Sequence, residues 1–287
     1  MPEPHSNISS LLRLIDDPDE EVYLAVVAQI RAMGPSAIPE LRAEIVRCEG
    51  PSARQRLTQI IRDFQVEPLN DLIRLLKLHQ QSETDIDLEE ALFLLDAFGR
   101  PEADRREVAA YLDDLALQVH EIFISQLPAN DLTHVLSIHS VMFEREGFHG
   151  ASADYYDPLN SYISSVIGRK EGIPVSLAAV ELLIADRVGL EMTGVAMPYH
   201  FVLYAPELHL YIDPFHAGNF ISRNDCITFL ERSGLSFHEQ MLQPVSNVDM
   251  IIRMIRNLSF AHNRKLEVWE AQVLEGALRD VSPSLPT

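Results

Sequence analysis

The residues best suited to chemistry in this sequence are a histidine and an aspartate, His200 and Asp213. Segments 200–204 and 208–213 are rich in β-branched and aromatic residues, and they predict two strands of a hairpin that turns about residues 206–207. In that hairpin the two residues are cross-strand neighbours with Cβ atoms about 4.5–5.5 Å apart. A carboxylate beside an imidazole fixes its tautomer and raises its basicity, which is the orienter–base half of a triad. A structural pair at a strand end, or a register slipped by one residue, remains an alternative.

Zinc ligation is the other chemistry that this segment suggests. Four potential ligands fall within a short stretch: His200, His209, Asp213 and His216. In the expected register His209 pairs with Tyr204, away from His200, and His216 belongs to a turn beyond the strand. Three ligands converge only if that turn folds back. We therefore expect no metal site and no other cofactor.

A buried helix is predicted just before these strands. Residues 175–188 are apolar almost all the way round, and Gly189 is a good helix stop. Pro174 fits the first position of this helix, where the missing N–H is not needed and φ is preset. A further strand is expected at 192–196.

Four short motifs follow one another through this region. They are Tyr-Tyr-Asp-Pro-Leu-Asn-Ser-Tyr at 155–162, Gly-Ile-Pro-Val-Ser-Leu at 172–177, Pro-Tyr-His-Phe at 198–201 and Ile-Asp-Pro-Phe-His-Ala-Gly at 212–218. With these motifs, residues 87–279 resemble the SirB-type transglutaminase-like family of bacterial cytoplasmic proteins, whose domain also occurs in a eukaryotic F-box protein. The resemblance implies a transglutaminase or papain-like core, in which a helix that begins with a cysteine packs on an antiparallel sheet bearing His and Asp. We expect a predominantly helical α+β fold, with this core flanked by helical segments.

The resemblance also implies roles for individual residues. When Gly189 is aligned with the glycine that ends the family's central helix, Pro174 takes the position of the catalytic cysteine. His200 and Asp213 then take the positions of the histidine and the aspartate. A proline ring has no nucleophilic atom, so the pair is expected to be vestigial. The motifs supply five further cleft candidates: Asn160, Ser161, Ser176, Tyr199 and His216.

No other residue is marked by its position as a substitute nucleophile. Ser176 lies about 200° round the helix from Pro174, and no motif places Ser161 near His200. Cys226 follows a Ser-Arg-Asn-Asp run that predicts a helix cap, and a half-buried structural cysteine is expected there. We therefore expect a pseudoenzyme. An enzyme that acts on amide bonds through an unrecognised cysteine or serine is the alternative.

Helical segments are expected on both sides of the core. In residues 1–80, an Asp-Asp-Pro-Asp turn at 16–19 and a Gly-Pro pair at 34–35 separate amphipathic stretches and resemble a HEAT-type repeat. A weaker second unit is expected at 53–78, and plain helical packing is the alternative. We therefore predict a helical extension at residues 1–80, a polar linker at 79–87 and the core at 85–240. A tetratricopeptide-like helical hairpin is expected at 241–287, and its last residues, 282–287, are expected to be disordered.

Composition limits the setting and the partners. The 287 residues are 47% hydrophobic and 23% charged, as in soluble globular proteins. The net charge of −20 disfavours nucleic acid and anionic membranes. Two cysteines do not make a disulfide framework and fit a reducing cytosol. The sequence contains no apolar stretch of membrane length. We expect a cytoplasmic protein whose vestigial cleft binds a protein or peptide, and the family's name alone implies regulation of gene expression.

Overall fold

The computed structural model describes residues 4–79, 84–126 and 130–281. In this part of the chain the fold is predominantly helical α+β, as predicted. The chain divides into two compact units: Met1–Leu72 with Leu94–Ala103, and Ile73–Phe93 with Asp104–Thr287. The predicted linker residues 80–83 and the predicted disordered tail 282–287 lie outside the described residues.

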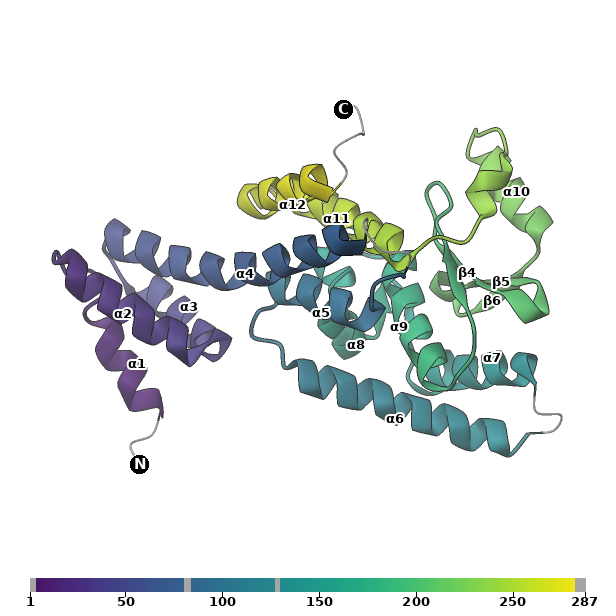
Figure 1. Cartoon of the computed structure of the whole chain (residues 1–287), viewed down its shortest axis with the longest axis horizontal. Coiled ribbons are helices and arrows are strands. Elements are labelled where there is room, and N and C mark those ends of the chain that lie inside the picture. The colour runs from purple at the N-terminus through teal and green to yellow at the C-terminus, as the bar shows by residue number, and fades with distance from the viewer. Residues whose placement is uncertain (1–3, 80–83, 127–129, 282–287) are drawn as a thin grey trace. The chain divides into compact units, whose positions relative to one another are not determined.

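Helices make up the first unit (Figure 1). They are α1 (Pro4–Leu12), α2 (Glu20–Met33), α3 (Ile38–Arg47) and most of α4 (Pro51–His79). The predicted breaks are confirmed, since Asp19 Oδ1 accepts the N–H of Glu21 at 2.9 Å and Gly34 ends α2 with a φ of 74°. Buried aliphatic side chains from the four helices share one core. Residues 53–78 do not form a separate helical pair, because α4 is one continuous helix that runs through Pro68.

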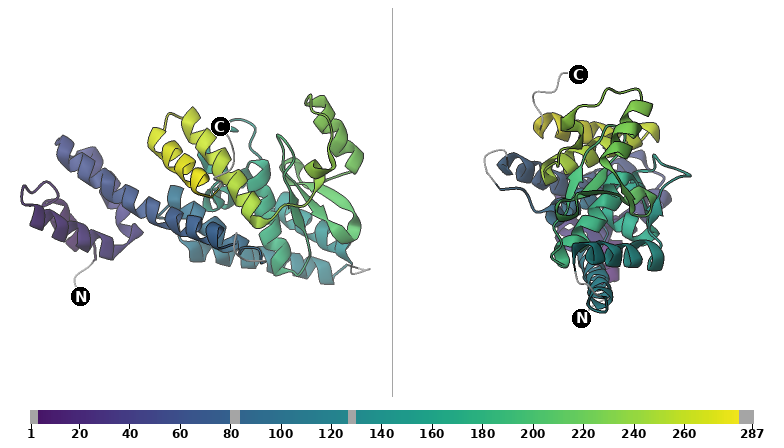
Figure 2. Two further views of the ribbon diagram at one scale, coloured as in Figure 1. Left: turned by 45° about the horizontal axis from the view of Figure 1, so that its top comes forward. Right: turned by 90° about the vertical axis from the view of Figure 1, so that its right-hand side faces the viewer.

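Helix α9 (Pro174–Arg187) lies at the centre of the second unit, and most of its side chains are buried, as predicted. The other helices there are α6 (Arg105–Ile124), α7 (Asp131–His139), α8 (Ile163–Arg169), α10 (Arg223–Arg232), α11 (Asn247–Arg264) and α12 (Val268–Val281); α5 (Leu88–Gly99) begins in this unit. Helices α6, α7, α8 and α11 pack against α9. Helix α11 pairs with α12, and the two lie side by side near the yellow end of the colour range in Figure 2. Among the described residues, no helix combines the length and the apolar character needed to cross a bilayer.

A small antiparallel sheet completes the second unit. Its order is β3 (Thr193–Val195), β4 (Val202–Ala205), β5 (Leu210–Asp213) and β6 (Asn219–Ile221). Strand β4 packs against α9. A separate parallel pair is formed by β1 (His149–Gly150) and β2 (Glu171–Gly172).

The predicted register of the hairpin was wrong by two positions. In the structure Leu203 pairs with Ile212 and Tyr204 with Tyr211, so Val202 rather than His200 stands opposite Asp213 in the ladder. His200 precedes the strand instead of beginning it. Because side chains alternate between faces with a period of two, a shift of two leaves His200 on the same side of the hairpin as Asp213.

Candidate functional site

A cavity of about 360 Å³ opens at the N-terminus of α9. The ring of Pro174, the first residue of that helix, lines it. The rest of its wall includes aromatic and aliphatic side chains, among them Tyr155, Met197, Phe215 and Phe229. His200 and Asp213 also line the cavity. The nucleophile position implied by the family resemblance therefore shares one cavity with the histidine and the aspartate.

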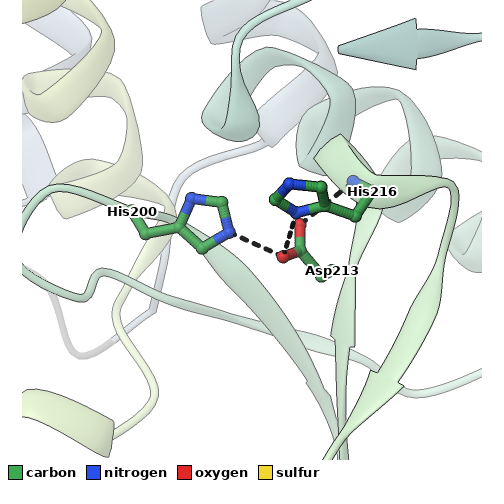
Figure 3. A group of neighbouring side chains, drawn as sticks. All are labelled: His200, Asp213 and His216. Carbon is green, nitrogen blue, oxygen red and sulfur yellow. Dashed lines mark hydrogen bonds and ion pairs between the residues drawn. The ribbon is translucent and has the colours of Figure 1, made fainter. Parts of the chain in front are cut away.

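Asp213 is the centre of a three-residue hydrogen-bonded cluster. Its Oδ2 lies 2.8 Å from Nε2 of His200 and 2.8 Å from Nδ1 of His216. The two imidazoles approach this oxygen from different segments, one before β4 and the other after β5 (Figure 3). His216 was predicted as a cleft candidate, whereas its convergence with His200 and Asp213 was not expected. The turn after β5 folds back, and His216 closes on the pair.

The fold of that turn follows from the Asp-Pro sequence. Oδ1 of Asp213 accepts hydrogen bonds from the backbone N–H groups of Phe215 and His216, at 3.1 and 3.3 Å. These bonds cap a single 3₁₀ turn, Pro214–His216. Ala217 and Gly218 then adopt left-handed conformations, with φ of 55° and 72°. An aspartate before proline, followed by a glycine, was the sequence signal that the chain turns back here.

A second tight turn positions His200. The N–H of His200 donates to the carbonyl of Met197 at 3.2 Å. Pro198 and Tyr199 occupy the two central positions, and Tyr199 has a φ of 65°. A left-handed φ is strained for a tyrosine, and such strain gathers at functional sites. The side chain of Tyr199 lines the cavity, and the residue is 71% exposed.

The remaining cleft candidates have structural roles or lie elsewhere. Ser176 Oγ accepts the N–H of Ile173 at 3.0 Å and donates to the carbonyl of Asn160 at 2.6 Å, so it caps α9. Asn160 is buried, and its Nδ2 donates to the carbonyl of Asp154 at 2.7 Å. Ser161 lines a different, smaller pocket. Of the five candidates, Tyr199 and His216 line the cavity and the other three do not.

Cys226 lines the same cavity, a position that the sequence did not indicate. It lies in the first turn of α10, which Ser222 caps as predicted by accepting the N–H of Asp225 at 3.2 Å. The residue is only 1% exposed and therefore more buried than expected. Burial, together with the negative charge of Asp225, raises the pKa of its thiol to about 11. At neutral pH this thiol is protonated and is a poor nucleophile.

A buried pair, His139 and Glu181, packs against the turn that carries His216. His139, the last residue of α7, places its Nε2 3.1 Å from Oε1 of Glu181, a fully buried residue on α9. A Cβ on Gly218 would come within 2.7 Å of the His139 ring, so the ring packs directly against the turn that carries His216. The sequence shows Glu181 as a polar break in an apolar helix, but it contains no signal that names its partner.

Burial raises the pKa of the Asp213 carboxyl, but hydrogen bonds and charge from His200 and His216 outweigh burial and hold that pKa below its usual value. A lowered folded-state pKa stabilises the protein above the unfolded pKa of about 4, and this contribution is lost as the pH falls further. We therefore expect wild type to lose more unfolding free energy than Asp213→Asn between about pH 5 and about pH 2.5. Urea unfolding at both pH values measures the difference, and equal losses in the two proteins would contradict the prediction.

The arrangement holds a base with its orienting carboxylate but places no reactive atom at the helix N-terminus. In acyl-transfer sites of this kind, the helix N-terminus and the imidazole together activate a thiol. Here the corresponding atoms belong to a proline ring.

Comparison with known proteins matches residues 106–256, more than half of the chain, to the transglutaminase-like superfamily. The chain is 29% identical over 160 residues to a UPF0162 protein of Xylella fastidiosa strain Temecula1, a match that covers 53% of this chain and 54% of the relative. It is 30% identical over 127 residues to a UPF0162 protein of Vibrio cholerae, covering 42% and 47%. F-box only protein 21 of Mus musculus is 29% identical over 133 residues, covering 42% of this chain and 21% of that protein.

The chain thus spans about half the length of the bacterial relatives. No solved structure matches it. The matched range contains the central helix, the four-stranded sheet and every residue of the cavity. The chain therefore belongs to the transglutaminase-like superfamily.

Proposed function

We propose that the chain is a non-catalytic, transglutaminase-like module of the SirB type that binds a peptide or protein segment in the cavity beside Pro174. The single observation that carries the proposal is the proline ring at the start of α9, in the cavity that holds His200 and Asp213. A base cannot activate a carbon ring. The cavity therefore holds the imidazole and the carboxylate beside a residue that cannot act as a nucleophile.

The lining of the cavity supports binding of an apolar or aromatic side chain. Phe215, Phe229 and Met197 contribute apolar side chains to the lining, and Tyr199 contributes a largely exposed aromatic ring. Pockets with an apolar lining and a few convergent polar groups are typical ligand sites, and exposed tyrosines are frequent contributors to binding energy. The imidazoles and Asp213 add hydrogen-bonding groups that can orient a backbone amide.

An amide-bond enzyme with an unrecognised nucleophile is the second candidate, and the position of Cys226 in the cavity wall favours it. The same residue argues against it, because burial keeps its thiol protonated. Labelling by a thiol- or serine-directed activity probe that is lost in His200→Ala would support the enzyme. Absence of such labelling would support the binding module.

The flanking helices complete the proposal. We propose that residues 1–80 act as a HEAT-like extension, 85–240 as the core and 241–287 as a tetratricopeptide-like tail, with the extensions adding contacts to the partner. The net charge of −20 supports a protein or peptide partner and not a nucleic acid or membrane. A cytoplasmic location fits the two free cysteines.

A random-peptide display library tests this function. We expect the purified chain to select peptides that share an aromatic or aliphatic anchor, and we expect Tyr199→Ala to weaken them by about 1–2 kcal/mol, which is roughly 5- to 30-fold in Kd. Fluorescence polarisation of a labelled peptide measures Kd. Leu117→Ala is the matched control, because it removes an exposed apolar side chain on α6, outside the cavity. If no peptide is selected, or if Tyr199→Ala binds as tightly as wild type, the proposal fails.

A further inference from the structure

We propose that His200, Asp213 and His216 form a binding site for a divalent transition-metal ion of the zinc class. The three ligand atoms lie within 4.8 Å of one another (Figure 3). These residues also line the cavity of the proposed function, but the metal site does not depend on peptide binding. It starts from the correction made above, that the turn after β5 folds back onto the His200–Asp213 pair.

The donor set suits such an ion. Two imidazole nitrogens and one carboxylate oxygen are ligands that zinc, cobalt(II) and iron(II) accept. With metal–ligand bonds of about 2.0–2.2 Å, tetrahedral ligands lie about 3.4 Å apart. The two N···O separations are each 2.8 Å, and all three ligand atoms lie within 4.8 Å of one another, so shifts on the order of 1 Å would admit the ion.

The carboxylate is already oriented for this role. Backbone N–H groups of Phe215 and His216 hold Oδ1 of Asp213, which leaves Oδ2 directed at the two imidazoles. Outer partners of this kind fix the direction of ligating carboxylates. Asp213 is also buried, so its charge is poorly solvated, and a bound dication would stabilise that charge.

The surroundings provide a route for the ion and a free coordination position. The side chain of His216 is 61% exposed, and the cluster borders the cavity at α9. Three protein ligands with one position open to a cavity is the arrangement of zinc sites that also hold water or a ligand. His209 lies away from the cluster, with its Nδ1 3.2 Å from the hydroxyl of Tyr204. It therefore serves as a matched control histidine.

Titration of the chelator-treated chain with cobalt(II), followed by visible absorption, tests the site. We expect one cobalt per chain, with the intense bands of a tetrahedral or five-coordinate ion, and displacement by zinc. His216→Ala and His200→Ala should each weaken binding by at least about 10- to 100-fold, because loss of a direct ligand costs no less than loss of an outer-shell partner. His209→Ala should bind like wild type. The exposed His216 side chain can be removed without opening the core, and far-ultraviolet circular dichroism checks that each variant is folded.

Two results would overturn the site. One is the absence of saturable one-to-one cobalt binding to wild type. The other is an affinity that His216→Ala leaves unchanged, or that His209→Ala lowers equally, since either would show adventitious binding by surface histidines. Because the probe is the metal alone, failure of peptide selection leaves this result intact, and failure of metal binding leaves the peptide result intact.

Discussion

Replacing Pro174 with cysteine should create a thiolate that reacts at mildly acidic pH. The new thiol would stand at the first position of a 14-residue helix, in the cavity that holds His200 paired with Asp213. A helix N-terminus and an adjacent imidazolium both lower a thiol pKa, from about 8.5 to between about 3.5 and 7.5. At about pH 6 a fall in pKa to about 7 raises the thiolate fraction roughly 30-fold.

The rate of alkylation by iodoacetamide, followed residue by residue with mass spectrometry, measures this effect. The comparison is between Pro174→Cys and Pro174→Cys/His200→Ala, which differ only in the imidazole. Cys226 in the same molecules is an internal control, because its raised pKa should keep it unlabelled at neutral pH. Loss of the proline at the helix start should cost about 0.4–1 kcal/mol of stability, which the fold can tolerate. Equally slow labelling of position 174 in the two variants would show that the imidazole does not act on that position.

The sequence predicted the helices and the buried central helix well because their periodicity is a local property. Residues 175–188 are apolar on every face, and the structure buries them in α9. The strands were predicted one or two residues out of place, because the turn at Met197–His200 depends on a left-handed Tyr199 that propensity does not favour. The hairpin register was wrong by two residues, but the predicted contact between His200 and Asp213 is present.

Contacts that depend on packing between distant segments were not predictable. His216 joins the cluster because Asp213 caps a short 3₁₀ turn, and only the Asp-Pro pair hints at that cap. Cys226 enters the cavity wall through the placement of α10, which its own sequence does not determine. The family resemblance identified Pro174, His200 and Asp213, but it could not show which other side chains line the cavity around them.

The pair of His139 and Glu181 is another contact between distant segments that the sequence could not predict. Breaking this pair should have the largest effect on stability. Glu181 is fully buried, and within the described residues Oε2 of its carboxyl group has no hydrogen-bond partner, so the imidazole of His139 is its main support. Removing one member of a buried pair leaves the other unsatisfied, and this costs about 3–5 kcal/mol. We expect His139→Ala to lose stability in that range, measured by urea unfolding with circular dichroism. His149→Ala, which removes an exposed histidine from strand β1, should change stability by less than about 0.5 kcal/mol.

The double variant His139→Ala/Glu181→Leu separates the lost pair from the lost packing. Replacing both members of a buried pair by apolar side chains is often neutral or stabilising, so most of the loss in His139→Ala should be recovered. The part of the stability loss that is not recovered measures the cost of the cavity left where the His139 ring packs against Gly218. Because that ring packs against the turn carrying His216, we expect the double variant to bind cobalt more weakly than wild type even when its stability returns. Equal stability of the single and double variants would show that the buried carboxyl group of Glu181 does not depend on His139.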